Sequence, residues 1–187
     1  MLRALAAHRP QRIIAEGLMK QAAVAAVLRQ THQTELLLIR RAEHPQDPWS
    51  GHMAFPGGRV DPQDPSPLSA AVREAKEEIG LDLDRYGRFA GELSHVGAMA
   101  HGKPLPLVVI PYAFSLEQTP ELVLDKKEVE EVLWVPLPFL MDPAQRSTMD
   151  YQKAGVNWKL PCYRYEGRII WGLTLRMLDE LLGLLAR

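Results

Sequence analysis

The chain has 187 residues, of which 47% are hydrophobic and 24% are charged, a composition typical of a globular protein rather than an extended disordered one. Its 22 Lys and Arg residues face 23 Asp and Glu residues, and the resulting net charge of -1 excludes the positive field that nucleic-acid binding requires. A single cysteine excludes an internal disulfide and a cysteine-rich metal site.

No apolar run approaches the roughly 20 residues of a membrane-spanning helix, so we expect no membrane partner. Residues 1–7 predict a short helix rather than the start of a signal peptide, because His8, Arg9 and Pro10 follow them. We therefore expect a soluble, cytoplasmic protein. Neither a repeat nor a linker-like segment interrupts the chain, and residues 1–187 are predicted to form a single domain.

Two buried strands are predicted first, at residues 22–28 and 35–39, joined by a polar turn at residues 30–34. A helix is the alternative for the first segment, which is rich in alanine. After a proline-rich loop, residues 53–55 predict another strand, which leads into Pro56-Gly57-Gly58.

A helix is predicted from residue 67 to residue 79. Ser66 suits the N-cap, Pro67 suits the first helical position and Gly80 suits the C-terminal cap.

The rest of the chain predicts strands and a second long helix. The predicted elements are strands at 91–97, 105–114 and 129–135, a helical turn at 137–140, a hairpin of 163–165 with 168–170, and a helix at 173–185. Strands mixed with few helices predict an α+β fold, with a central mixed β-sheet sandwiched between helices (α/β/α).

Glu74, Glu77 and Glu78 lie three or four residues apart and therefore share one face of the predicted helix 67–79. Crowded carboxylates repel one another, and a hard divalent cation such as Mg²⁺ or Mn²⁺ relieves that repulsion better than zinc does. Arg73 lies four residues before Glu77 and can orient the cluster with a forked hydrogen bond. Taken alone, this pattern also fits a merely solvated acidic face.

Gly57 and Gly58 join a predicted strand to the segment before this helix. Glycine lets the backbone turn sharply and approach a ligand closely. Gly58 is therefore a candidate to offer a carbonyl oxygen to the same metal ion.

The segment from Gly58 to Leu81 resembles the Nudix box, GX5EX7REUXEEXGU, in which U is aliphatic. Its second half, residues 73–81, matches the pattern with Ala75 at the U position. Asp64 stands at the first acidic position, where the glutamate of other family members helps to orient the site. The spacer before Arg73 is one residue longer than in the pattern. The resemblance implies a Nudix fold in which the box, residues 58–81, forms a loop–helix–loop.

The flanking segments resemble the coenzyme A pyrophosphatase branch of the Nudix hydrolases. The resemblance rests on residues 37–42, Gly51, residues 55–58 and residues 170–178, and it extends roughly from residue 22 to residue 182. The loop at residues 43–50 departs from the branch's upstream motif, which expects an Arg near Gln46 and a shorter spacing to Gly51.

The resemblance implies a metal-dependent hydrolase that cleaves the diphosphate linkage of a nucleoside diphosphate derivative. Coenzyme A or acyl-coenzyme A is the leading substrate, and nucleotide sugars or ADP-ribose are the alternatives. A non-catalytic, nucleotide-binding Nudix module is the rival interpretation, but it predicts loss of the box carboxylates, which are present here.

The resemblance also assigns candidate roles to individual residues. Mg²⁺ or Mn²⁺ would be bound by Glu74 and Glu78, with Glu77 and Gly58 as further candidates. The candidates for catalysis are Glu77, Glu78, Glu128 and Arg73, and the candidates for substrate binding are Arg40, Arg41 and Arg59. Solvated surface roles are the alternatives for Glu128 and for Arg40 and Arg41.

Two further expectations concern surfaces. Trp49, in the proline-rich loop, either packs against the core or stacks on a nucleotide base. Dimers are common in the family, and the apolar C-terminal helix offers a candidate surface for a homodimer.

Overall fold

The structure is a computed structural model that describes residues 2–15, 17, 19–100, 102–153 and 155–186. Its helices are α1 (Leu2–Ala7), α2 (Pro67–Ile79), α3 (Leu83–Tyr86), α4 (Leu137–Met141) and α5 (Gly172–Leu185), with a 3₁₀ turn at Pro143–Gln145. Its strands are β1 (Lys20–Gln30), β2 (Thr34–Arg41), β3 (Met53–Ala54), β4 (Gly57–Arg59), β5 (Gly87–Glu92), β6 (Val96–Ala100), β7 (Lys103–Leu116), β8 (Val129–Pro136), β9 (Arg146–Lys153), β10 (Val156–Tyr165) and β11 (Arg168–Trp171). Met1 lies outside the described residues.

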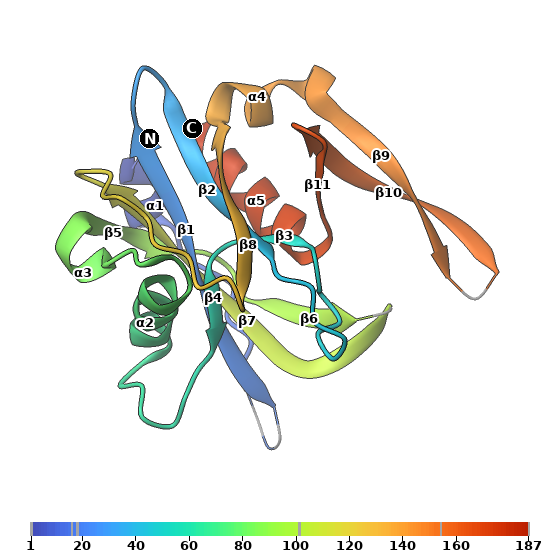
Figure 1. The fold of residues 1–187 in the computed structure, drawn as a ribbon, viewed down its shortest axis with the longest axis horizontal. Helices are drawn as coiled ribbons and strands as arrows, with labels where there is room; N and C mark the ends of the chain where they lie inside the picture. The colour runs from blue at the N-terminus through green and yellow to red at the C-terminus, as the bar shows by residue number, and fades with distance from the viewer. Residues whose placement is uncertain (1, 16, 18, 101, 154, 187) are drawn as a thin grey trace.

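A mixed, strongly curved sheet forms the centre of the fold (Figure 1). In the described part of the chain its strands follow the order β3–β2–β1–β7–β5, while β4 pairs with β1, β6 with β7 and β8 with β2. β1 and β7 run parallel, from Lys20 opposite Leu107 to Leu28 opposite Ser115. The other pairs in this sheet are antiparallel. The predicted α+β class with a central mixed sheet is confirmed.

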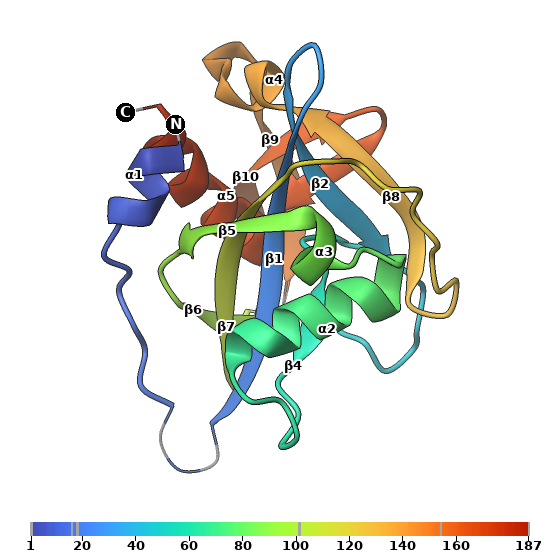
Figure 2. The same cartoon turned by 90° about the vertical axis from the view of Figure 1, so that its left-hand side faces the viewer.

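The sheet is covered on both faces, and β1 explains why. Successive side chains of a strand point to opposite faces. Alternate residues of β1 accordingly enter two apolar clusters, one shared with α2 (Ala23, Ala25, Val27) and one shared with α5 (Val24, Ala26, Leu28). Figure 2 shows α2 in front of β1 and α5 behind it.

Helix α2 begins and ends where the sequence predicts. The Ser66 hydroxyl accepts a hydrogen bond from the Ser69 N–H at 3.1 Å, and Pro67 occupies the first turn. Gly80 ends the helix in the left-handed conformation, with a φ of 69°. The apolar face that packs on the sheet is small, which lets the helix approach the alanines of β1 closely; its buried members are Ala70, Ala71, Ala75 and Ile79.

Helix α5 packs its apolar face into the core of the same chain. Its buried leucines are Leu175, Leu178, Leu181, Leu182, Leu184 and Leu185. The apolar character that made this helix a candidate dimer surface is thus explained by packing within one chain.

The strands β9, β10 and β11 form a second sheet in the order β11–β10–β9. The β9–β10 hairpin projects from the body of the molecule (Figure 1). Sequence patterns missed β9 and the outer half of β10, because their residues are largely polar or exposed and show no buried alternation.

The other predicted strands lie within longer observed ones, with two exceptions. The strand predicted at 53–55 is shorter in the structure, where β3 ends at Ala54. A single strand at 91–97 is wrong, because the chain forms β5 and β6 on either side of residues 93–95. The Ser94 N–H bonds to the Glu180 carboxylate of α5 at 2.9 Å rather than to a neighbouring strand. This side-chain bond interrupts the ladder at that point.

No helix among the described residues combines the length and the apolar composition that crossing a membrane would require.

We predict that Gly57→Ala strongly destabilises the fold. Gly57 has a φ of 145°, and a Cβ atom there would lie 2.2 Å from the Ala23 carbonyl oxygen and 2.5 Å from the Val24 Cα. Both contacts are to the backbone of β1, which cannot move independently of the sheet. The expected loss is about 3 kcal/mol of unfolding free energy, measured by urea denaturation.

Gly183→Ala is the matched control, because a Cβ at this exposed position of α5 meets nothing within 4 Å. Replacing glycine inside a helix stabilises by up to about 1 kcal/mol. The two variants should therefore shift in opposite directions, and a neutral Gly57→Ala would contradict the close packing of β4 on β1.

Candidate active site

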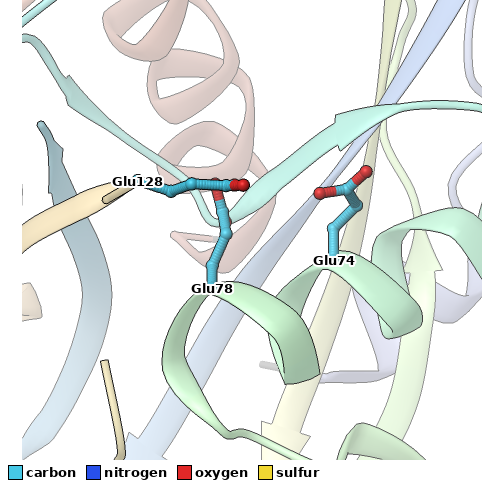
Figure 3. Close-up of side chains that lie close together, drawn as sticks. All are labelled: Glu74, Glu78 and Glu128. Atoms are coloured by element: carbon cyan, nitrogen blue, oxygen red, sulfur yellow. The ribbon is translucent and has the colours of Figure 1, made fainter. Parts of the chain in front are cut away.

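Three carboxylates from two separate segments converge beside β4. Glu74 and Glu78 extend from α2, and Glu128 comes from the loop before β8 (Figure 3). One oxygen from each lies within 4.8 Å of the others. Sequence spacing alone brings Glu74 and Glu78 together, whereas Glu128 joins them through the tertiary fold.

Backbone hydrogen bonds place the loop that carries Glu128. The Asp125 N–H donates to the Glu78 carbonyl at 2.9 Å, and the Val123 N–H donates to the Ile79 carbonyl at 3.0 Å. The Glu128 carbonyl accepts from the Ala42 N–H at 2.8 Å. The loop is therefore fixed to the end of α2 on one side and to the end of β2 on the other.

Glu78 is the buried member of the three carboxylates, with 2% of the residue exposed. Its carboxylate accepts a hydrogen bond from the Gly57 N–H at 2.7 Å. Burial nevertheless raises the pKa of Glu78 to about 8, because the Gly57 bond and the nearby Arg41 offset only part of the lost hydration. Burial also raises the pKa of Glu74, against the opposing effect of Arg73.

The Arg73 guanidinium contacts three carboxylates, Asp64, Glu74 and Glu77, and so helps to fix their positions. Its Nε and Nη2 donate to the two oxygens of Asp64 at 2.9 and 3.0 Å, and its Nη1 donates to Glu77 at 2.7 Å. Nη2 also lies 3.0 Å from a Glu74 oxygen and donates to the Arg59 carbonyl at 3.2 Å. The bond from Arg73 lowers the pKa of Asp64. Asp64 thus makes a bidentate ion pair with Arg73 despite the substitution and the longer spacer.

Glu77 occupies a different position from Glu74 and Glu78. Its side chain is 57% exposed, and one of its oxygens is bonded to Arg73. Glu77 lines the cavity beside the three converging carboxylates. The bond from Arg73 goes to Oε2 of Glu77.

Gly58 lies against the carboxylate of Glu74. A Cβ atom at this position would be 2.5 Å from the Glu74 Cδ and 2.6 Å from each of its oxygens. Any larger residue would displace the carboxylate. The absence of a side chain at Gly58 is therefore a geometric requirement of the cluster.

A cavity of about 560 Å³ opens in front of these carboxylates. Its acidic wall contains Glu74, Glu77, Glu78 and Glu128. The rest of the lining is largely aromatic and aliphatic, and it includes Trp49, Trp171, Leu107, Val109, Leu173 and Met177. The cavity has the size and the mixed lining that are typical of small-molecule sites.

The three candidate substrate-binding arginines differ in position. Arg59 lines the cavity, and among the described residues its guanidinium has no ion-pair partner. Arg41 also lines the cavity, but its guanidinium is bonded to Asp47. Arg40 is absent from the described cavity lining and pairs with Glu130 at 3.2 Å.

Sequence patterns gave no role to Asp47, although it lines the cavity beside Arg41 and Trp49. An acidic residue in a proline-rich loop carries no motif, and its pairing with Arg41 is visible only in the fold. Trp49 packs on the core and also lines the cavity, so the packing role is observed and stacking on a nucleotide base stays a prediction.

The converging carboxylates fit a divalent cation such as Mg²⁺ or Mn²⁺. All the donors are hard oxygens, and two ligands on opposite sides of a Mg²⁺ ion lie about 4 Å apart. Small side-chain rotations would bring the three oxygens to that spacing. Burial is the main cause of the raised pKa values of Glu74 and Glu78, and the neighbouring carboxylates raise them further.

We predict that the metal-free protein loses stability as pH rises and that Glu78→Gln does not. A carboxyl with a pKa of about 8 in the folded chain and about 4.3 when unfolded binds its proton more tightly in the folded state. Stability is therefore highest below the unfolded pKa and falls as pH rises towards the folded pKa. In chelator near pH 9, Glu78→Gln should be more stable than the wild type by a few kcal/mol, measured by urea denaturation.

The difference should become small near pH 4.5, because Glu78 is then protonated in the folded wild type and carries no buried charge. Glu121→Gln removes an exposed carboxylate outside the cavity lining and should follow the wild type at both pH values. A wild type whose stability is constant over this range would contradict a buried, protonated Glu78.

The sequence profile of the NUDIX domain matches residues 19–165. The chain is 31% identical over 147 residues to NudL, an uncharacterized Nudix hydrolase of Yersinia enterocolitica, covering 78% of this chain and 71% of that protein. The NudL protein of Yersinia pestis matches with the same identity.

Solved structures share the fold. The C. elegans Ap4A hydrolase, in a binary complex, superposes with a TM-score of 0.54 at 24% identity, covering 65% of this chain and 83% of that one. A MutT/nudix family protein from Enterococcus faecalis gives a TM-score of 0.53 at 18% identity, covering 95% of this chain and 71% of that one.

The family profile spans most of the chain, and two of the three converging carboxylates, Glu74 and Glu78, lie on the helix of the predicted box. The chain therefore belongs to the Nudix family and is a hydrolase that acts on substrates containing a pyrophosphate linkage.

Proposed function

We propose that this chain cleaves the diphosphate linkage of a nucleoside diphosphate derivative in a reaction that depends on Mg²⁺ or Mn²⁺. The observation that carries the proposal is the convergence of Glu74, Glu78 and Glu128, with oxygens within 4.8 Å of one another, at the wall of a cavity of about 560 Å³. Coenzyme A or an acyl-coenzyme A is the leading substrate. A nucleotide sugar or ADP-ribose is the alternative.

In this proposal Glu74, Glu78 and Glu128 hold the cation, with the Gly58 carbonyl and Glu77 as further candidates. The bound cation supplies positive charge that neutralises the diphosphate and stabilises the leaving oxygen. Burial of Glu78 and the bond from the Gly57 N–H favour a fixed carboxylate that needs little reorganisation.

Glu77 is our first candidate for the proton acceptor. Arg73 holds one of its oxygens at 2.7 Å, which leaves the other oxygen to accept a proton from the attacking water. Glu128 is the alternative acceptor, since its side chain is exposed to the cavity from a different segment. Arg73 acts here as a positioning residue, because its guanidinium contacts carboxylates on the wall.

Arg59 is our candidate for binding the phosphate oxygens. It directly follows the two glycines of β4, lines the cavity, and has no carboxylate partner among the described residues. A guanidinium matches a phosphate with two parallel hydrogen bonds. Arg41 and Arg40 are weaker candidates, because Asp47 and Glu130 already pair with them.

The leading substrate rests on the resemblance of the flanking segments together with the shape of the cavity. Apolar and aromatic residues line the cavity together with the carboxylates, as a long or planar group attached to the diphosphate would require. A small-molecule substrate and a single catalytic unit spanning residues 1–187 form part of the proposal.

A product-resolved hydrolysis panel tests the proposal. The purified chain, with Mg²⁺ or separately Mn²⁺, is given coenzyme A, acetyl-coenzyme A, ADP-ribose, UDP-glucose and a nucleoside triphosphate. We expect 3′,5′-ADP and 4′-phosphopantetheine from coenzyme A, with no product in excess chelator. Glu78→Gln should lower kcat by about a hundredfold or more, because a carboxylate of the cation site is lost.

Glu121→Gln, an exposed carboxylate outside the cavity lining, is the matched control and should retain full activity. Cleavage of ADP-ribose or UDP-glucose instead of coenzyme A would replace the leading substrate with the alternative. Absence of any metal-dependent cleavage, together with retained nucleotide binding, would favour a non-catalytic module.

We also predict that Arg59→Ala raises KM for the cleaved substrate about tenfold or more and changes kcat much less. Removing a hydrogen bond to a charged group typically weakens binding by this factor or more. Steady-state kinetics measure the two constants separately. A large fall in kcat with an unchanged KM would instead mean that Arg59 acts only in the transition state.

A further inference from the structure

The loop between β2 and β3, residues 42–52, carries Trp49 to the cavity, and an ion pair joins it to the end of β2. Asp47 accepts hydrogen bonds from Arg41 through Oδ2, at 2.8 Å from Nε and 2.7 Å from Nη2. Its other oxygen, Oδ1, accepts from the Trp49 N–H at 3.0 Å. One carboxylate thus joins the end of β2 to the backbone of the tryptophan.

The rest of the loop is closed by its own hydrogen bonds. Ser50 accepts from the His44 N–H at 2.7 Å and donates to Glu43 at 2.9 Å. The Arg41 N–H donates to the His52 carbonyl at 3.1 Å, which joins the two ends of the loop. The segment is therefore a compact unit whose attachment to the sheet depends on few contacts.

Trp49 reaches from this loop to β6. Its indole Nε1 donates to the Met99 carbonyl at 3.2 Å, and Trp49 lines the cavity that also contains the carboxylates. Trp171 and His52 line it too, with their ring centroids 5.0 Å apart. The position of Trp49 therefore contributes to the aromatic part of the cavity lining.

The same loop is coupled to the acidic cluster. The Ala42 N–H, at the start of the loop, donates to the carbonyl of Glu128. Arg41 also lines the same cavity as Glu78 and Glu128. The loop that carries Trp49 is thus attached to the segment that carries Glu128.

We infer that Asp47 is a positioning residue for substrate recognition: by pairing with Arg41 it holds Trp49 as the wall against which the planar or apolar group of the nucleotide substrate packs. In this inference Arg41 fixes the loop through Asp47 and does not bind the phosphate. This inference rests on the proposed function, and it gives Arg41 a role that differs from phosphate binding.

The two roles for Arg41 predict opposite effects of Asp47→Asn. If Arg41 binds phosphate and Asp47 merely restrains it, the variant releases a guanidinium and KM falls. If the pair positions Trp49, the loop loosens and KM rises about tenfold, with kcat changed less than about threefold. Asp47→Glu, which keeps the charge, should lie between Asp47→Asn and the wild type.

The test combines kinetics on the panel substrate with acrylamide quenching of Trp49 fluorescence. Subtracting the signal of a Trp49→Phe counterpart isolates Trp49 in each variant. We expect Asp47→Asn to raise both KM and the quenching constant of Trp49. Asp179→Asn, which breaks the Arg146–Asp179 pair away from the cavity, should change neither.

A fall in KM, or a quenching constant equal to that of the wild type, would overturn the inference. The fluorescence measurement does not depend on catalysis, so it remains decisive if no panel substrate is cleaved. That outcome would count against the proposed function, while increased quenching would still support the positioning of Trp49 by Asp47.

Discussion

The hydrogen bond from the Gly57 N–H to the buried Glu78 carboxylate joins β4 to α2, and the geometry of the site depends on it. The bond forms because β4 lies directly on β1, where Gly57 leaves no room for a Cβ atom, and because α2 approaches the same strand through alanines. Both approaches use the smallest side chains available. A carboxyl group is thereby held in the interior at a fixed distance from the backbone, where ionisation is costly for folding and useful for binding a cation.

The two arginines beside Glu74, Glu78 and Glu128 make their hydrogen bonds mainly to other carboxylates. Arg73 is occupied by Asp64 and Glu77, and Arg41 is occupied by Asp47. Neither arginine fully neutralises the converging carboxylates, although both stand beside them. Two guanidiniums that paired fully with Glu74 and Glu78 would compete with a metal ion. Because each arginine pairs with a carboxylate outside the converging three, it orients the site without taking the place of a metal ion.

Local signals predicted the parts of this arrangement that lie within one element. Helix α2 was predictable in both bounds, because Ser66, Pro67 and Gly80 are cap residues whose effect extends over a few residues. The role of Glu128 beside Glu78 was predicted only from the resemblance to the Nudix hydrolases, because its position depends on the bond between Asp125 and the end of α2. The Arg41–Asp47 pair has no sequence signature, because it forms within an irregular loop. The break between β5 and β6 at Ser94 has none either, because the Glu180 side chain there replaces a backbone partner.

The two departures from the box pattern meet at one contact, the ion pair between Asp64 and Arg73. Asp64 has one methylene fewer than glutamate, and the extra residue lies between Asp64 and Arg73, within residues 65–72. Just before this longer spacer the chain forms a tight turn, in which the Asp64 N–H donates to the Asp61 carbonyl at 2.9 Å and the Asp61 N–H donates to the Asp64 carboxylate at 2.8 Å. This turn brings the shorter acid to Arg73 with both oxygens engaged. Because the contact is made by side chains across a loop, it tolerates an insertion that would disrupt a strand register or a helix face. The box can therefore vary here while the helix that carries Glu74 and Glu78 stays in place.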